Sequence, residues 1–507
     1  MNARIPHRLV AATAVAAASI LALSACSAGS SSGGGSATSD AVVIGLTGEP
    51  VNLDFTTTSG AAIPQVVMNN VYEGLVTIDQ DGELQPQLAE SWEVSEGGTV
   101  YDFVLQDGVL FSDGEDFTAD DVVFSIERVQ SDAWLNGTKS KMDVVDSVEA
   151  VSDTEVRVTL SRPSNAWLFD MGTYVGAMFS ETGVDDLATE PIGTGPYTVE
   201  SFVSGDRITL AGRDDYWGEE PDITDVTLRY FADAVASTNA LRSGDVDMVY
   251  NMQAPDLMGQ FESDEAFQVI EGTSNGEILL SMNNKVAPFD DVRVRQAVMY
   301  AIDRQAVIDA AWAGYGTEIG AMVAPTDPYY EDLTDLYPYD PEKARELLAE
   351  AGAENISITF DVPTRPYATA VSEIVVSQLA EVGIDASIQS SEFPAVWLDK
   401  VFTQADYQMS VILAVEARDV LATFNNPDYY IGYDNAKIAD QVIAADSGTP
   451  EEYVSGMKEV VRTITEDAAS DVLFLFPNLV VAKAELGGIA ANAVTESLVL
   501  SGLTWTD

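Results

Sequence analysis

Apolar and polar residues alternate with a period of two in the first part of the chain. Val42–Leu46 forms an apolar run, and Tyr101 and Phe103 alternate with polar neighbours. This pattern is typical of short, half-buried strands. Thr118 and Asp121 then have the spacing of a capping box ahead of an apolar stripe, which predicts a helix. The sequence therefore predicts a strand-rich region that carries one short helix.

Helical periodicity becomes stronger further along the chain. A helix is expected to begin near Asp233, to carry Val235 and Leu241 inward, and to end at Gly244. Past Pro288, Asp290 or Asp291 begins a helix whose apolar face contains Val294, Ala297, Val298, Ala301 and Ile302.

The next helix and the segments after it form a β-α-β pattern. Asp340 begins a helix, Pro341 occupies its first turn, and Gly352 ends it. A strand at 356–360, a helix at 368–381 and a strand at 384–388 then imply a parallel pair with a crossover. Open sheets of this kind bind ligands beyond the carboxyl ends of their strands. We therefore expect α/β lobes that close on a ligand like a hinged clamp.

The amino-terminal segment has the three parts of a secretory signal. Basic residues stand at Arg4 and Arg8, an uncharged run follows to Ala25, and Cys26 comes next. Leu23 to Cys26 resembles the bacterial lipobox, in which the cysteine becomes acylated. We expect residues 1–25 to be the signal peptide and residues 26–39 to be a lipidated Cys26 with a flexible Ser/Gly linker.

The charge of the chain limits its partners. The chain has 507 residues, of which 82 are acidic and 24 basic, and its net charge is −58. Nucleic acid is excluded as a partner because phosphate binding needs a basic patch. The acidic surface fits either a well-solvated protein adapted to salty surroundings or a field that attracts cationic solutes. No stretch after the signal is apolar enough to span a membrane.

The residue types also limit the chemistry. His7, the only histidine, lies in the signal peptide, and Cys26 is the only cysteine. Ser274 stands in a G-x-S-x-G pattern but has no histidine to activate it, so we interpret the segment as a turn before a strand at 278–282. Asp79 and Asp81 lack the remaining spacing of a calcium loop and predict a hairpin turn. We expect no enzyme activity, no metal site and no cofactor. A lipid-anchored hydrolase that uses an acid pair or an activated serine remains a distant alternative.

A set of motifs in a fixed order resembles the family-5 extracellular solute-binding proteins, the peptide- and nickel-type receptors of ABC importers. The resemblance covers nearly the whole chain after the signal. Its motifs are Tyr72–Leu75, Leu88–Trp92, Phe111–Gly114, Phe117–Asp121, Gly193–Tyr197, Arg242–Asp247, Asn283 and Asn284, Phe289–Arg295, Tyr300–Arg304 and Tyr339–Ala344.

The resemblance implies an α/β fold, a two-lobed periplasmic-binding-protein-like clamp of type II, cluster C-like, with an extra strand-rich subdomain. Lobe I would comprise residues 40–282, with the subdomain inserted at about 76–190. Lobe II would comprise residues 283–469. Residues 470–507 would return to lobe I, and the ligand would lie between the lobes.

The resemblance also implies candidate ligand contacts. Arg365 and Tyr367 resemble an element that dipeptide-binding relatives use near the peptide carboxylate, which an arginine fork binds well. Glu416 or Asp419 would receive the peptide ammonium, although this stretch lacks the family's usual Trp and Asp-Pro step. Arg418 would bind an anionic group or hold Glu416. The remaining candidate is an aromatic contact, Trp397.

We therefore expect a monomeric, exported lipoprotein on the outer face of the cell membrane. It would capture an extracellular solute and deliver it to an ABC permease and ATPase complex. The leading candidate for this solute is a di- or oligopeptide. Alternatives are a receptor for a metal chelate, a sugar or an amino-acid derivative, and a surface lipoprotein that has lost its ligand.

Overall fold

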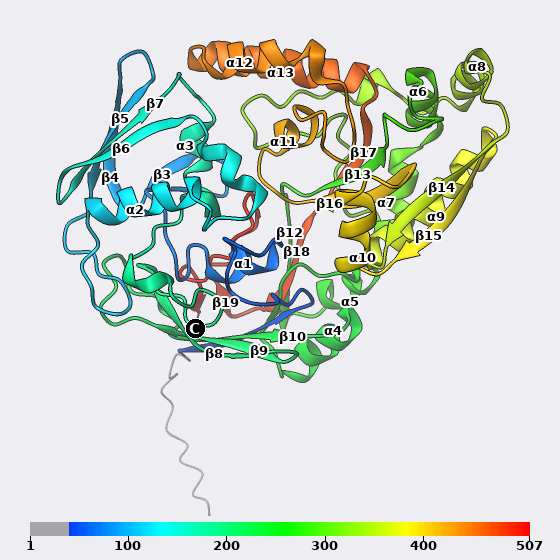
Figure 1. Cartoon of the computed structure of the whole chain (residues 1–507). Coiled ribbons are helices and arrows are strands. Elements are labelled where there is room, and N and C mark those ends of the chain that lie inside the picture. The colour runs from blue at the N-terminus through cyan, green and yellow to red at the C-terminus, as the bar shows by residue number, and fades with distance from the viewer. Residues whose placement is uncertain (1–39, 507) are drawn as a thin grey trace, which may run out of the picture. The chain divides into compact units, whose positions relative to one another are not determined.

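A computed structural model describes residues 40–506, which belong to one compact unit (Figure 1). The predictions for the signal peptide, Cys26 and the linker at 26–39 lie outside the described residues. Three larger sheets and two short two-stranded ones organise the described part of the chain. This mixed α/β architecture agrees with the predicted fold class.

A seven-stranded sheet forms the base of the first lobe. Its strand order is β12-β18-β11-β1-β10-β9-β8, and β1 pairs in parallel with both β10 and β11. The bounds are β1 Ala41–Leu46, β8 Tyr197–Val203, β9 Arg207–Gly212, β10 Asp225–Tyr230, β11 Met248–Val249, β12 Phe267–Gly272 and β18 Asn478–Lys483.

A four-stranded antiparallel sheet with the order β4-β5-β7-β6 forms the strand-rich subdomain, within the segment expected at 76–190. A hairpin, β2–β3, precedes it, and β19 pairs with β20 near the carboxyl end. The bounds are β2 Val76–Ile78, β3 Leu84–Pro86, β4 Ala89–Ser95, β5 Val100–Leu105, β6 Val145–Ser152, β7 Glu155–Leu160, β19 Leu486–Gly487 and β20 Thr504–Trp505.

A five-stranded sheet with the order β15-β14-β16-β13-β17 forms the second lobe. Strands β14 and β15 are parallel, which confirms the predicted pair, whereas β13 is antiparallel to both of its neighbours. The bounds are β13 Glu277–Met282, β14 Ile356–Pro363, β15 Ile384–Ser391, β16 Met409–Ala414 and β17 Ser470–Leu475.

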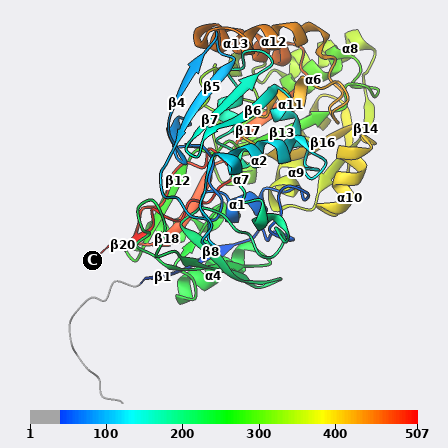
Figure 2. The same cartoon turned by 60° about the vertical axis from the view of Figure 1, so that its left-hand side comes forward.

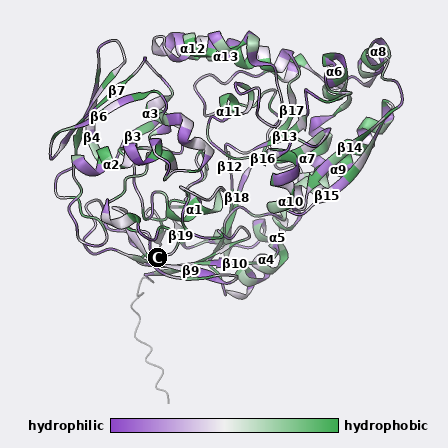
Figure 3. Ribbon diagram, viewed as in Figure 1, coloured by the Kyte–Doolittle hydropathy of each residue, from purple (hydrophilic) through white to green (hydrophobic). Residues whose placement is uncertain are grey.

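The helices cover these sheets. Their bounds are α1 Ala62–Val67, α2 Ala119–Gln130, α3 Trp167–Asp170, α4 Ala234–Ser243, α5 Gly259–Glu262, α6 Val292–Ala301, α7 Arg304–Trp312, α8 Pro341–Ala351, α9 Pro366–Glu381, α10 Ala395–Trp397, α11 Val420–Phe424, α12 Ala439–Asp446 and α13 Pro450–Glu466. Figure 3 shows hydrophobic and hydrophilic residues mixed along outer helices such as α8 and α13. One side of each such helix can therefore pack inward while the other meets water.

The second sheet has a hydrophobic core on each face. One core includes residues of α6 to α9 together with Ile278 and Leu280. The other includes Leu279 and residues of α11 to α13. Successive side chains of β13 therefore point to opposite cores, as the period of two in a strand requires.

The predicted helix ends are confirmed where local chemistry decides them. Thr118 and Asp121 form a capping box at α2, and Asp233 caps α4. Gly244 ends α4 in a left-handed conformation, which a residue with a side chain rarely adopts. Val235 was expected to face inward but is 56% exposed, because the buried face of α4 consists of Ser237, Thr238, Ala240 and Leu241 and does not include Val235.

The chain passes from one large sheet to the other at residues 273–276 and again at residues 476–477. Strand β13 lies in the second sheet because it pairs with β16, and β17 lies there because it pairs with β13. The chain therefore leaves the first sheet at residues 273–276, before the expected lobe limit at 282. It returns to the first sheet at residues 476–477, after the expected limit at 469.

Candidate functional site: charged residues between the lobes

Two neighbouring chain segments connect the lobes. The Ser274 hydroxyl donates to the Phe476 carbonyl oxygen at 2.5 Å and accepts from the Gly276 amide at 3.0 Å. The Phe476 amide donates to the Gly276 carbonyl at 2.6 Å. Ser274 thus holds the two crossings together, and the predicted strand after this turn is confirmed as β13.

The Asp446 latch joins the strand-rich subdomain to the second lobe. We define it as the loop at 162–166 with residues 446–448, and Figures 1 and 2 show α12 beside the four-stranded sheet. The buried Asp446 carboxylate accepts from Arg162 Nη1 at 2.5 Å, Ser164 Oγ at 3.0 Å and the Ala166 amide at 3.0 Å. The Asn165 side chain donates to the carbonyls of residues 446 and 448. Both oxygens of the carboxylate have partners.

The charged cluster is a second meeting of the lobes. It contains Lys141, Asp170 and Glu496 from the first lobe and its subdomain, and Glu277, Asp327, Glu416, Arg418 and Asp419 from the second lobe. Members from the two lobes interact electrostatically, as Lys141 does with Glu416 and Asp419. Six are acids and two are bases, so the cluster has a formal excess of negative charge.

Two ion pairs use both bases of the cluster. Lys141 Nζ lies 3.1 Å from Asp170 Oδ1, and Arg418 Nε lies 3.1 Å from Asp327 Oδ1. The Arg418 guanidinium also lies 3.4 Å from the centre of the Phe169 ring in α3. A cation over an aromatic face is attracted by the ring quadrupole. Arg418 therefore contacts both lobes.

The other four acids of the cluster, Glu277, Glu416, Asp419 and Glu496, form no ion pair with any described residue. Burial, together with the Glu416 charge, raises the pKa of Glu496 to about 7. Burial and Glu416 also raise the pKa of Asp419 well above its usual value. The carboxylates thus repel one another in a poorly solvated place.

Glu277 is the most enclosed of the four. It is the first residue of β13 and is 4% exposed, and its Oε2 has no hydrogen-bond partner among the described residues. Burial first, then the charges of Asp419 and Asp327, raises its pKa well above the usual value. A buried polar atom without a partner is costly, so the Glu277 carboxyl is a candidate for contact with a ligand.

The structure brings three of the six predicted contact residues together. Glu416, Arg418 and Asp419 all lie in the charged cluster. Their contact with a ligand stays a prediction, as does that of Arg365. Arg365 precedes α9, is half-buried, and lies 4.7 Å from the centre of the Phe393 ring.

The two predicted aromatic contacts lie in the cores of the second lobe. Tyr367 is buried, and its hydroxyl accepts from the Leu413 amide at 3.0 Å. Trp397 is buried, and its indole N–H donates to Ser410 Oγ at 3.1 Å. Their polar atoms are thus used inside the protein, which favours a packing role for both.

The sequence did not indicate the other five members of the cluster. Lys141 and Asp170 lie in the subdomain, and Glu496 lies in the carboxyl-terminal tail, so only the folded chain assembles them. Glu277 offered one signal: it is an acid that opens an otherwise apolar strand. In a chain with 82 acids, that signal has little weight.

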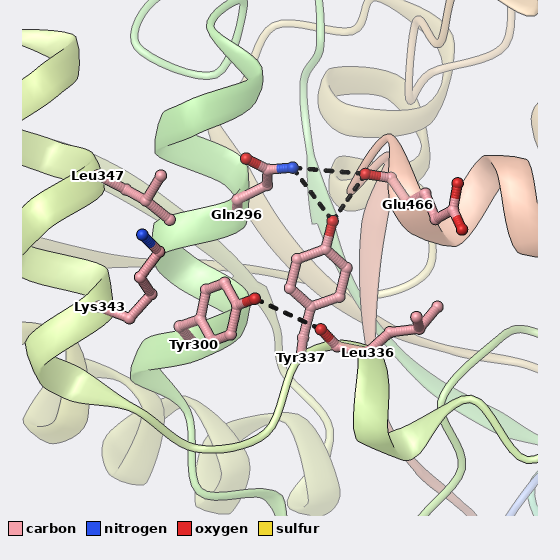
Figure 4. Close-up of a pocket in the computed structure, with 7 residues that line it drawn as sticks. All are labelled: Gln296, Tyr300, Leu336, Tyr337, Lys343, Leu347 and Glu466. Carbon is pink, nitrogen blue, oxygen red and sulfur yellow. Dashed lines mark hydrogen bonds between the residues drawn. The ribbon is translucent and has the colours of Figure 1, made fainter.

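A separate cavity of about 320 Å³ lies in the second lobe and shares no residue with the charged cluster (Figure 4). The Tyr337 hydroxyl donates to the Glu466 carbonyl at 2.7 Å, and Gln296 Nε2 lies 3.2 Å from the same hydroxyl. The Tyr300 hydroxyl donates to the Leu336 carbonyl at 3.5 Å. These polar groups are occupied by the protein itself, so the cavity offers a ligand few free partners.

Residues 40–506 contain neither a metal-binding group of side chains nor a membrane-spanning helix. Within that range, no group of three or more acidic, histidine or cysteine side chains is arranged to hold a metal ion. No helix of the same range has the length and hydrophobicity needed to cross a bilayer.

Comparisons with known proteins identify relatives. The chain is 30% identical over 347 residues to the heme-binding protein A of Haemophilus influenzae, an alignment that covers 62% of this chain and 63% of that protein. It is 31% identical over 345 residues to the dipeptide-binding protein of Escherichia coli K12, covering 61% and 64%. The aligned region thus spans under two thirds of the length of these relatives.

A solved structure shows the same fold over the whole described chain. The periplasmic binding protein DppA from Helicobacter pylori, in complex with the peptide STSA, superposes with a TM-score of 0.82 at 22% identity. The match covers 93% of this chain and 99% of that one. The family model for the bacterial extracellular solute-binding proteins, family 5 (middle), matches residues 83–433. The chain therefore belongs to the family-5 bacterial extracellular solute-binding proteins.

Proposed function

We propose that this protein is the solute receptor of an ABC importer and captures a di- or oligopeptide between its lobes without altering it chemically. The observation that carries the proposal is the charged cluster, because side chains from both lobes contribute to it. A ligand that binds such residues favours the arrangement in which the lobes are close. Closed receptors of this kind would then dock on the permease and ATPase complex.

The peptide class is supported by unpaired groups of both signs. Glu416 and Asp419 have no ion-pair partner among the described residues and are suited to an ammonium. Arg365 forms no ion pair with a described residue and stands at the amino end of the 16-residue helix α9, where anions are favoured. A free peptide carries a positive ammonium at its amino terminus and a negative carboxylate at its carboxyl terminus. The relative from Escherichia coli is named a dipeptide-binding protein, which agrees with this proposal.

A non-peptide solute is the second candidate. It is supported by the relative from Haemophilus influenzae, which is named a heme-binding protein and is about as similar as the dipeptide-binding one. Native mass spectrometry of the purified protein separates the candidates. A retained ligand with a peptide mass supports the proposal, and a retained heme, metal chelate, sugar or amino-acid derivative contradicts it.

Arg365→Ala tests the carboxylate contact. We expect this variant to lose at least tenfold in affinity for a free-acid dipeptide but little for its carboxamide, because only the acid offers a charged fork partner. Arg345→Ala is the matched control, since it removes one exposed cation from the same lobe. Equal losses for acid and amide, measured by calorimetry, would remove Arg365 from this role.

We also infer that the protein is exported and held by a lipid on Cys26 at the outer face of the cell membrane, where it acts as a monomer. The signal and lipobox pattern in the sequence supports this. Cys26→Ala is expected to release the protein into the medium while peptide affinity stays unchanged. A variant that remains in the membrane fraction contradicts the anchor.

A further inference from the structure

We propose that the solute carries a second cationic group, a basic side chain beside its amino terminus, and that Glu277 binds this group. The inference rests on the proposed function and deepens it by naming the class of peptide. The charged cluster contains more acids than bases. After the pairs Lys141–Asp170 and Arg418–Asp327 are formed, four carboxylates have no cationic partner among the described residues.

One ammonium does not satisfy this arrangement. Glu416 and Asp419 are neighbours on one loop and suit a single amino terminus between them. That leaves Glu277 and Glu496, and of these two it is Glu277 whose carboxylate has a buried oxygen, Oε2, without a partner among the described residues. A buried carboxylate without a counter-ion must bind a proton or accept a large desolvation cost. A neutral ligand that filled the space would remove more water and increase this cost.

The position of Glu277 shows where the second cation would lie. Glu277 lies on the same face of β13 as Leu279 and Ser281, since side chains two apart share a face. The charges that act on it are Asp419 from the loop before α11 and Asp327 from a second loop, and both are negative. Arg418 pairs with Asp327 through Nε and stacks on Phe169. The bases of the cluster are thus engaged elsewhere, and the field at Glu277 is negative.

An apolar contact lies beside these charges. Phe169 and Ile78 of the first lobe pack with Ala417 of the loop that carries Glu416 and Arg418. The methylene stem of a lysine or arginine can pack on such a surface while its charged end reaches a carboxylate. A basic side chain therefore matches the site better than a small inorganic cation.

The test compares lysyl-alanine with norleucyl-alanine, which has the same stem without the charge, and with cadaverine, which has two amines without a peptide. We expect calorimetry to show at least tenfold tighter binding of lysyl-alanine than of norleucyl-alanine. In Glu277→Gln this preference should fall to under threefold, with the affinity for norleucyl-alanine unchanged or higher. Glu373→Gln removes an exposed acid of the same lobe and should keep the preference.

The melting temperature of Glu277→Gln shows whether the variant is folded. Without ligand, Glu277→Gln is expected to melt a few degrees higher than the parent, because folding no longer has to protonate or desolvate an unpaired carboxylate. A lower melting temperature would indicate that Glu277 has a structural partner and would contradict the proposal.

The outcomes separate this inference from the proposed function. Equal affinity of the two dipeptides overturns the second cationic group and leaves the peptide receptor intact. Binding of cadaverine with no binding of either dipeptide overturns the peptide function and supports a dicationic solute. No binding of any of the three probes overturns both.

Discussion

The Asp446 latch and the charged cluster both place acids between the same two lobes, yet they differ in how those acids are satisfied. At the latch, one carboxylate accepts three hydrogen bonds from the subdomain. In the charged cluster, four carboxylates lack an ionic partner among the described residues. The latch carboxylate has all its partners within the protein, whereas four carboxylates of the cluster have none of opposite charge among the described residues. We infer that the latch stabilises closure and that the cluster selects what is enclosed.

The largest expected effect comes from breaking the latch. Asp446→Ala removes the acceptor of Arg162, Ser164 and Ala166 and should destabilise the closed arrangement by about 2–3 kcal/mol. Ligand affinity should fall by about tenfold to a hundredfold, because closure contributes to binding. Calorimetry with the bound peptide checks this result.

Asp440→Ala is the control for the latch, since Asp440 is exposed on the same helix. It should bind as the parent does. An Asp446→Ala protein with parental affinity would show that the latch contributes nothing to closure.

The next effect tests the paired part of the cluster. Lys141→Met leaves Asp170 without its partner, so the ligand-free protein should lose about 1–3 kcal/mol of unfolding free energy. The affinity for a cationic ligand should instead rise severalfold, because one competing positive charge is gone. Chemical denaturation and calorimetry give the two quantities.

Lys139→Met is the matched control for this change, because Lys139 lies two residues away and donates to the Ser131 carbonyl rather than to an acid of the cluster. A weaker affinity of Lys141→Met for the cationic ligand would contradict this expectation. It would show that the excess of negative charge in the cluster does not determine which ligand is bound.

The smallest effect is a pH dependence of the ligand-free protein. The pKa of Glu496 is raised to about 7 in the folded state, above its usual value of 4.5, so the folded state binds the proton more tightly. Stability should therefore increase as pH falls from about 7.5 to 5.5, by about 2 °C in melting temperature. Affinity for a cationic ligand should decrease over the same window.

Glu496→Gln isolates this contribution, and differential scanning calorimetry at several pH values measures it. The variant should show a smaller increase in stability at low pH than the parent. An identical pH profile in the two proteins would assign the effect to other groups.

Local features of the fold were predictable from sequence because neighbouring residues decide them. The cap Asp233 with the stop Gly244, and the capping box of Thr118 and Asp121, act within a few residues. The burial of Val235 was predicted wrongly because the orientation of a helix depends on what it packs against. The strands β13 and β17 depend on long-range pairing, which the sequence does not reveal. The sequence analysis therefore assigned both to lobe I, whereas they pair within the sheet of the second lobe.

The site was only partly predictable for the same reason. Glu416, Arg418 and Asp419 lie close together in sequence, so one resemblance indicated all three. Glu496 and Lys141 join them only through the fold. Tyr367 and Trp397 have the residue type of ligand contacts, but burial decides between packing and binding, and the sequence does not reveal burial in a chain of mixed hydrophobicity.

The position of β1 has a mechanical consequence. This first described strand is not at an edge of its sheet but lies between β10 and β11, with hydrogen bonds on both sides. A pull on the chain ahead of residue 40, directed along the strand, would load both ladders together in shear. A strand at an edge would instead peel away one bond at a time. If the anchor that we infer at Cys26 is present, this central position of β1 would spread its load over the whole sheet of the first lobe.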